Sequence, residues 1–262
     1  MTKAGLYVYA IIPAEAKTEN KLGTGIDAER LRVVAGGSVA AVVHASETEP
    51  YQGPDSHVER WILEHSQVVD AAWEAAGTVL PVSFNVIVNP GESETAENRL
   101  TQWLAGISDT ASEHLEQLRD RVELRVEITL DESVVASNSP ELVEMRQTTE
   151  ARPAGVQRLY RKRFEERTRE IAERAADQLY TAYRPRLAAL AEDLVENSRP
   201  GRNPGSVGVL TVSLLVHRFT VDSVGVELAD IRDSQPGVQI RYSGPWPPYS
   251  FADVSEVDSS AP

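Results

Sequence analysis

The side chains that most often carry out chemistry are either missing from this sequence or too far apart to act together. The chain has no cysteine, which excludes thiolate nucleophiles, disulfides and thiolate-bound metals. His57 and His65 fall on one predicted helix, but about two helical turns separate their rings, too far for one metal ion. His65 also shares an apolar stripe with Trp61 and Val69, so we interpret it as a packed or hydrogen-bonded core side chain.

Glycine-rich segments give no catalytic signal either. Residues 201–208 follow a predicted helix and precede a predicted strand, whereas a phosphate cradle needs a helix N-terminus facing the anion. The sequence Gly205-Ser206-Val207-Gly208 also lacks the Gly-X-Ser-X-Gly spacing of a nucleophile elbow. We therefore predict that the protein is not an enzyme and that it binds no metal or cofactor.

The excess of acidic residues bears on which kinds of partner the protein can bind. The chain has 40 acidic and 26 basic residues, which gives a formal net charge of −14. Nucleic acids and anionic membrane surfaces both require a footprint of Lys and Arg, so this excess disfavours them. In the basic stretch 158–174, many cations lie four residues from a Glu, as Lys162 does from Glu166. We interpret the stretch as a self-compensated helix face, with a positive surplus at its N-terminal end that suits an acidic partner.

Hydropathy gives no membrane or export signal. Pro13 stops the apolar run from Leu6 to Ile12, and no small-residue cleavage site follows it. No stretch approaches the roughly 20 apolar residues that cross a bilayer. We therefore expect a cytoplasmic protein.

The first half of the chain is predicted to alternate between strands and helices. The predicted elements are strands at 5–12, 38–43 and 79–88, and helices at 56–76 and up to about residue 119. Gly77 is placed to end the first helix in a left-handed conformation, and Gly106 is expected to divide the second one. The segment between the first two strands is interpreted as a Gly-bearing connector.

The second half has a different pattern. The predicted elements are strands at 121–130, 207–216 and 238–242, a short helix after Ser139, a long helical segment at 156–196, and a helix at 219–231. Strand 121–130 alternates cleanly, which predicts apolar side chains inward and every charge outward. Pro185 is expected to kink or split the long segment, and the short acidic tail after Phe251 is expected to be mobile.

Together these elements predict an α+β protein with two domains. We place the boundary between residues 119 and 120, with an N-terminal α+β domain at 1–119 and a C-terminal domain at 120–262. The second domain is predicted to be a modified ferredoxin-like fold with a long helical segment. A boundary near Pro153 is the alternative.

One short segment has a composition unusual enough to be compared with the motifs of known protein families. It combines three prolines with three aromatic residues directly after a predicted strand, in the order Gly244, Pro245, Trp246, Pro247, Pro248, Tyr249, Ser250 and Phe251. This octapeptide resembles the C-terminal hallmark of the GvpL/GvpF family of gas vesicle proteins. Weaker similarities occur in the family's order at Leu6-Tyr7-Val8-Tyr9, Leu80-Pro81-Val82 to Phe84, Val122-Glu123-Leu124 and Leu215-Val216-His217-Arg218. Ser83 and Asn85 depart from the family pattern, in which Arg and Gly are usual.

The resemblance implies an accessory or minor structural protein of gas vesicle assembly. Its implied partners are the hydrophobic shell subunit and other accessory vesicle proteins, with a chaperone-like or nucleating role, two α+β domains and no catalytic residues. The alternative is a small-molecule- or nucleotide-binding enzyme on a ferredoxin-like scaffold. Within the octapeptide, which serves packing or partner contact, we expect Trp246 and Tyr249 to be packed against the fold.

Overall fold

The computed structural model describes residues 4–16, 18, 21–151, 153–197 and 204–253. The chain forms two compact units, which we call unit 1 (Met1–Glu123 and Trp246–Pro262) and unit 2 (Leu124–Pro245). The end of the hallmark segment therefore belongs to unit 1, although it follows unit 2 in the sequence. Both units combine helices with a β-sheet, which confirms the mixed α and β class.

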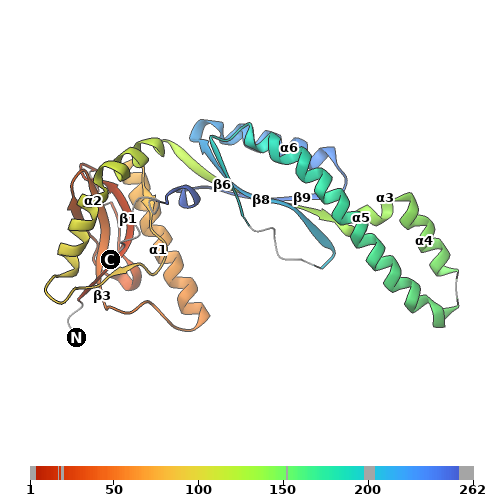
Figure 1. Ribbon diagram of the computed structural model, residues 1–262, viewed down its shortest axis with the longest axis horizontal. Helices are drawn as coiled ribbons and strands as arrows, with labels where there is room; N and C mark the ends of the chain where they lie inside the picture. The colour runs from red at the N-terminus through yellow and green to blue at the C-terminus, as the bar shows by residue number, and fades with distance from the viewer. Residues whose placement is uncertain (1–3, 17, 19–20, 152, 198–203, 254–262) are drawn as a thin grey trace. The chain divides into compact units, whose positions relative to one another are not determined.

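Unit 1 is built around an antiparallel sheet between two long helices. The strands are ordered β2 (Arg32–Gly36), β3 (Val39–Ser46), β1 (Gly5–Pro13) and β4 (Leu80–Pro81), and β5 (Ile87–Val88) also pairs with β1. Helices α1 (Asp55–Ala76) and α2 (Ala96–Gln117) lie on opposite faces of this sheet (Figure 1). Every residue of β1 is buried, as the run of apolar side chains predicts for a central strand covered on both faces.

Three predictions for unit 1 were wrong in their details. The connector before the second strand contains β2, whose sequence is too short and too mixed to give a periodic signal. The predicted strand at 79–88 is two short strands, because Asn85 adopts a left-handed conformation (φ 72°) that interrupts extended pairing. Gly77 ends α1 with φ 76° as predicted, whereas α2 runs unbroken through Gly106.

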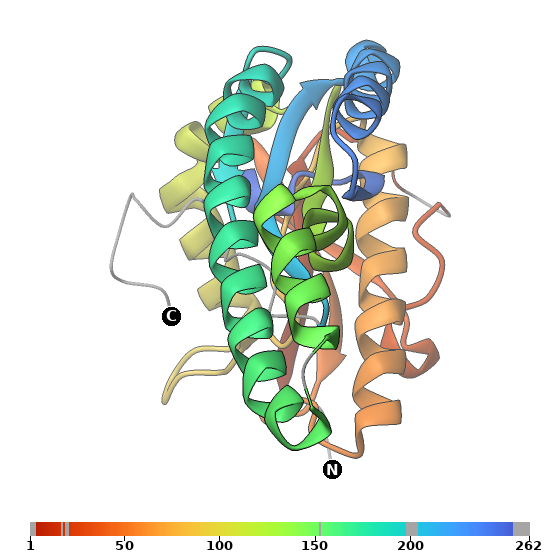
Figure 2. The same cartoon turned by 90° about the vertical axis from the view of Figure 1, so that its right-hand side faces the viewer.

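Unit 2 carries the second sheet. Its strands are β6 (Arg121–Asp131), β7 (Asp193–Glu196), β8 (Ser206–His217) and β9 (Val238–Trp246), in the spatial order β7-β8-β6-β9. The helices of unit 2 are α3 (Glu132–Asn138), α4 (Pro140–Glu150), α5 (Ala154–Ala188) and α6 (Val221–Ser234), with the short 3-10 turn η2 (Arg218–Thr220). A second 3-10 turn, η3 (Tyr249–Phe251), belongs to unit 1. Figure 2 shows α4 running beside α5, so the two form a helical arm.

The long helical segment ends earlier than predicted. Helix α5 stops at Ala188, and residues 193–196 form β7 at the edge of the sheet. Pro185 lies inside the last turn of α5, so the prediction that it splits the helix near residue 184 was wrong. Pro185 has no N–H to donate to the carbonyl of Thr181, yet α5 continues through it to Ala188. The predicted mobile tail lies almost wholly outside the described residues.

No helix within the described ranges is both long enough and apolar enough to cross a membrane.

Candidate functional site

The aromatic end of β1 anchors a chain of buried hydrogen bonds in unit 1. The hydroxyl of Tyr7 lies 2.9 Å from Nδ1 of His65, and Nε2 of His65 lies 3.0 Å from the carbonyl oxygen of Val82. A carbonyl only accepts, so Nε2 donates to it, and in a neutral imidazole Nδ1 then accepts from Tyr7. The backbone N–H of Asn85 completes the chain by donating to the Tyr7 hydroxyl at 3.0 Å. This confirms His65 as a hydrogen-bonded core residue.

A second chain runs beside the first. The hydroxyl of Tyr9 accepts from the backbone N–H of Ile26 at 2.8 Å and lies 2.7 Å from Nδ1 of His44. Nε2 of His44 lies 3.2 Å from the hydroxyl of Tyr51. The rings of Tyr7 and His44 also stack, with centroids 5.1 Å apart and planes within 8°. His65 therefore links helix α1 to strand β1, and His44 links strand β3 to β1 and to the loop before α1.

The electrostatics of these groups point to structure rather than to acid–base chemistry. Burial lowers the pKa of His65 to about 4, well below the usual range of histidine, although its hydrogen bond to Val82 opposes the shift. Burial likewise raises the pKa of Tyr51 to about 12 and raises the pKa values of Tyr7 and Tyr9 further. At neutral pH these side chains are therefore uncharged. Among the described residues, no group of three potential ligands is placed to hold a metal ion.

The hallmark octapeptide is divided between buried and exposed side chains. It starts at the end of β9, where Gly244 has φ 127° and precedes a cis peptide bond to Pro245. Pro247, Pro248 and Phe251 are buried, and Tyr249 is partly buried against the core of unit 1. The packing expected of Tyr249 is thus confirmed.

The packing expected of Trp246 was wrong. Its side chain is 44% exposed, so much of the indole faces solvent at the point where β9 ends. The error arises because the sequence shows only that an aromatic residue follows a strand. Pro245 and Pro247 restrict the backbone on either side of Trp246.

A buried carboxylate fastens the octapeptide to unit 1. Glu123 is fully buried, and its Oε2 accepts from the backbone N–H of Ser250 at 2.7 Å while its Oε1 accepts from the Ser250 hydroxyl at 2.8 Å. The alternation of strand β6 predicted that Glu123 would point to solvent with the other charges, and that prediction was wrong. A buried carboxylate is tolerated only when donors satisfy it, and the sequence gives no sign that residue 250 supplies them.

Four of the five segments that carry the family resemblance meet in unit 1, whereas the segment at 215–218 lies in unit 2. Tyr249 of the octapeptide and Phe84 of the segment at 80–88 both pack against the core cluster that contains Tyr7 and Tyr9. Glu123, from the segment at 122–124, holds the octapeptide at Ser250. Four stretches that are far apart in the sequence therefore form one packed cluster, which we call the signature cluster.

The structure shows the surroundings of Asn85 and Ser83, the two residues that depart from the family pattern. Asn85 occupies the left-handed region that Gly tolerates best and Asn next best, and its side-chain amide pairs with the backbone of Tyr51 at 2.9 and 3.1 Å. Ser83 is exposed, so an Arg at this position would lie at the surface. Asn in place of Gly at position 85 thus preserves the turn, and Ser in place of Arg at position 83 removes a positive charge from the surface.

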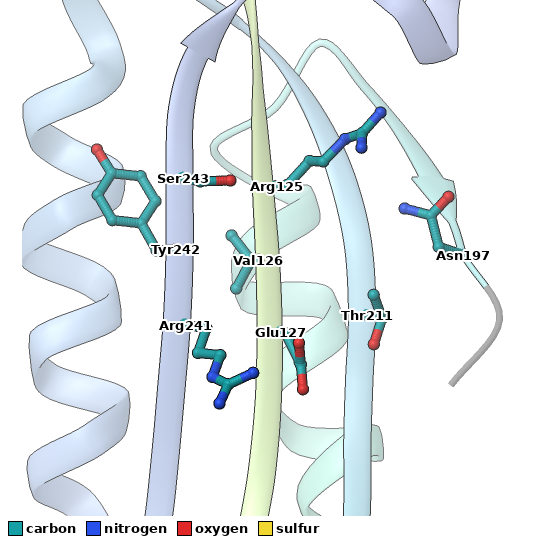
Figure 3. A pocket seen from close by; sticks show the side chains of 8 residues that line it. All are labelled: Arg125, Val126, Glu127, Asn197, Thr211, Arg241, Tyr242 and Ser243. Carbon is teal, nitrogen blue, oxygen red and sulfur yellow. The ribbon is translucent and has the colours of Figure 1, made fainter. Parts of the chain in front are cut away.

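A polar groove of about 500 Å³ lies on the sheet of unit 2 (Figure 3). It is lined by Arg125, Val126, Glu127, Asn197, Thr211, Arg241, Tyr242 and Ser243. Arg241 and Glu127 face the groove without forming an ion pair within the part of the chain that the structure describes. The groove therefore presents charges of both signs beside hydroxyl groups.

Comparisons with known proteins agree with the resemblance. The family model for gas vesicle synthesis protein GvpL/GvpF matches residues 5–253. Gas vesicle protein L of Haloferax mediterranei is 30% identical over 242 residues, which cover 87% of this chain and 72% of that protein. Gas vesicle protein L1 of Halobacterium salinarum is 29% identical over 267 residues, which cover 95% and 90%.

Solved structures share the fold. The crystal structure of the gas vesicle protein GvpF from Anabaena sp. PCC7120 superposes with a TM-score of 0.67 at 19% identity, over 96% of this chain and 97% of that one. GvpF from Microcystis aeruginosa gives a TM-score of 0.66 at 19% identity, over 96% of this chain and 100% of that one. Since the family model spans nearly the whole described chain, this protein belongs to the GvpL/GvpF family of gas vesicle proteins.

Proposed function

We propose that the protein is an accessory component of gas vesicle synthesis that binds the hydrophobic shell subunit, in a chaperone-like or nucleating role, and that it is not an enzyme. Family membership supports the place in gas vesicle synthesis. The physical need is plain, because a subunit that lines a gas-filled wall exposes apolar surface and aggregates unless a partner covers it. An acidic protein that keeps such a subunit in solution meets this need.

The exposed indole of Trp246 is the observation that carries the binding role. Tryptophan is enriched among the residues that dominate binding energies, because it contributes a large rigid apolar surface. The ring is 44% exposed, while the segment that follows it is fixed by buried prolines and by the Glu123–Ser250 hydrogen bonds. A preorganised aromatic side chain loses little entropy when a partner covers it.

The octapeptide thus has two roles in this proposal. Its last five residues (Pro247, Pro248, Tyr249, Ser250 and Phe251) pack against the fold, and Trp246 contacts the shell subunit.

We also propose that the two compact units are domains and that unit 2 is ferredoxin-like. Its order of one strand, helices, two strands, a helix and a strand, with the sheet order β7-β8-β6-β9, supports this.

The test compares three variants of the full chain for binding to purified shell subunit. Trp246→Ala should abolish or strongly weaken binding, while its urea midpoint falls much less than that of a variant at a fully buried aromatic residue, because Trp246 is 44% exposed. Phe219→Ala is the matched control: Phe219 is 83% exposed in unit 2, and its loss should change neither binding nor stability.

The third variant, Phe251→Ala, removes a side chain that is only 8% exposed and should lower the free energy of unfolding by about 3–5 kcal/mol. Unchanged binding by the folded Trp246→Ala variant would refute the contact. A large stability loss in that variant would instead return Trp246 to a packing role.

A further inference from the structure

The start of α5 carries a concentration of positive charge in an acidic protein. Four cations fall within six residues, at Arg158, Arg161, Lys162 and Arg163, and Arg146 of α4 is also exposed. We call these five residues the basic tip of the arm. Arg146 lies over the ring of Phe164 at 5.7 Å, and Arg163 lies over the ring of Tyr160 at 5.9 Å.

The sequence pattern predicted a positive surplus at this end of the stretch, and few of these cations have a carboxylate partner among the described residues. Lys162 and Glu166 are 3.9 Å apart, but Arg158 and Arg161 form no ion pair among the residues that the structure describes. Arg158 and Lys162 are four residues apart on one helix, so their like charges repel. The arrangement destabilises the isolated helix, and an anionic surface placed against it would relieve the repulsion.

The next turns of the same helix behave differently. Arg167 pairs with Glu141 at 2.5 Å and with Glu170 at 2.8 Å, and Arg186 near the other end pairs with Glu227 at 2.5 Å. Arg167 and Arg186 are thus each matched with carboxylates of the same unit. The densest group of cations on α5 is the one at the basic tip.

Unit 1 offers a surface of the opposite charge. A cleft of about 360 Å³ is bordered by Glu29, Glu47 and Glu49, and its wall includes Tyr51 and Trp61. Glu47 and Glu49 are exposed and form no ion pair within the described ranges. Carboxylates beside aromatic faces suit a guanidinium, which forms charge-assisted hydrogen bonds and stacks on rings.

We propose that the basic tip of one copy docks in the acidic cleft of a second copy. The charges are complementary, and exposed Leu159 (55% exposed) adds apolar contact beside the arginines. Because the tip and the cleft are different surfaces, the contact is heterologous, and each bound copy presents a free tip or cleft to the next. The protein therefore associates head to tail into oligomers whose size falls as salt screens the charges. This does not depend on the role of Trp246.

The test is a charge exchange on the full chain, followed by sedimentation velocity at 20 and 500 mM salt. The wild type should associate at low salt and dissociate at high salt. Reversal of the tip (Arg158→Glu with Arg161→Glu) or of the cleft (Glu47→Lys with Glu49→Lys) should each weaken self-association at least tenfold. An equimolar mixture of the two variants should associate again, because each supplies the surface that the other lacks.

The matched control is Arg169→Glu with Arg174→Glu, which makes the same charge change on exposed positions of α5 and should leave association unchanged. Circular dichroism checks that each variant is folded. A wild type that stays monomeric at low salt, or a mixture of the tip and cleft variants that stays monomeric, overturns the proposal. Binding of the basic tip to anionic lipid vesicles or to DNA in place of a second copy also overturns it.

Discussion

At the scale of single residues, His65 shows how a titratable side chain can serve structure alone. Its ring lies between the Tyr7 hydroxyl and the Val82 carbonyl, so it bridges β1 and the segment after β4 while remaining neutral. Position on an apolar stripe was enough to predict that His65 is buried. Its two partners come from segments 58 and 17 residues away, and no local pattern identifies them.

The neutral state of His65 has a consequence for stability against pH. The unfolded chain binds a proton at this histidine below its usual pKa of 6.5, whereas the folded chain does so only below about 4. The stability that the neutral ring of His65 contributes is therefore fully present above pH 6.5 and is lost as the pH falls toward 4. The loss amounts to about 3 kcal/mol in the free energy of unfolding.

Urea unfolding at pH 7 and pH 4.5 checks this, with His65→Gln as the comparison. The variant should be less stable at pH 7, but its stability should fall less steeply with acid than that of the wild type. Parallel curves for the two proteins would show that His65 does not carry this pH dependence.

Glu123 is the second residue whose role rests on a distant partner. Its carboxylate accepts two hydrogen bonds from Ser250, so Glu123→Gln leaves at least one buried donor poorly satisfied. We expect a loss of about 1.5–3 kcal/mol in the free energy of unfolding, because hydrogen bonds to buried charges are stronger than neutral ones.

The control for this variant is Glu127→Gln on the same strand, where no hydrogen bond or ion pair is present within the described residues. It should change stability by less than about 0.5 kcal/mol. Equal urea midpoints for Glu123→Gln and the wild type would mean that Glu123 does not fasten the octapeptide.

At the scale of elements, the contact between β2 and α2 is close enough to require glycine. A Cβ atom added at Gly36 would lie 2.5 Å from the carbonyl oxygen of Thr101 and 2.6 Å from Cβ of Leu104. Gly36→Ala should therefore lower the free energy of unfolding by about 1–3 kcal/mol or more.

Gly106 is the matched contrast, since it lies exposed inside α2 with no atom within 4 Å of an added Cβ. Gly106→Ala should raise stability by about 0.5–1 kcal/mol, the usual gain in a helix interior. Thermal melts of both variants check the opposite signs. A stabilising Gly36→Ala would contradict the close packing of β2 on α2.

Elements with an uninterrupted hydrophobic pattern could be predicted from the sequence, whereas elements whose form depends on tertiary contacts could not. The central strand β1 and helix α1 carry uninterrupted patterns, and both formed where expected. The segment at 80–88 also alternates, but the hydrogen bonds of Asn85 to Tyr51 bend it into a turn. Leu194 fits the helical stripe of α5 as well as it fits β7, and only pairing with β8 decides between them.

At the scale of the whole molecule, the family resemblance has a structural basis in the signature cluster. Tyr7, Phe84, Glu123 and Tyr249 are far apart in the sequence but meet in unit 1. The sequence indicated that each belongs to a shared pattern. It could not show that the octapeptide returns to unit 1, because that return depends on the Glu123–Ser250 hydrogen bonds and on contacts between distant segments.

The most direct test of a role in gas vesicle synthesis is a clean deletion of the gene in its host, scored by electron microscopy and by flotation of cells. The account predicts that the deletion strain lacks gas vesicles or makes malformed ones while its growth rate is normal. The wild-type chain should restore the vesicles, and the folded Trp246→Ala variant should not. Normal, buoyant vesicles in the deletion strain would contradict the account.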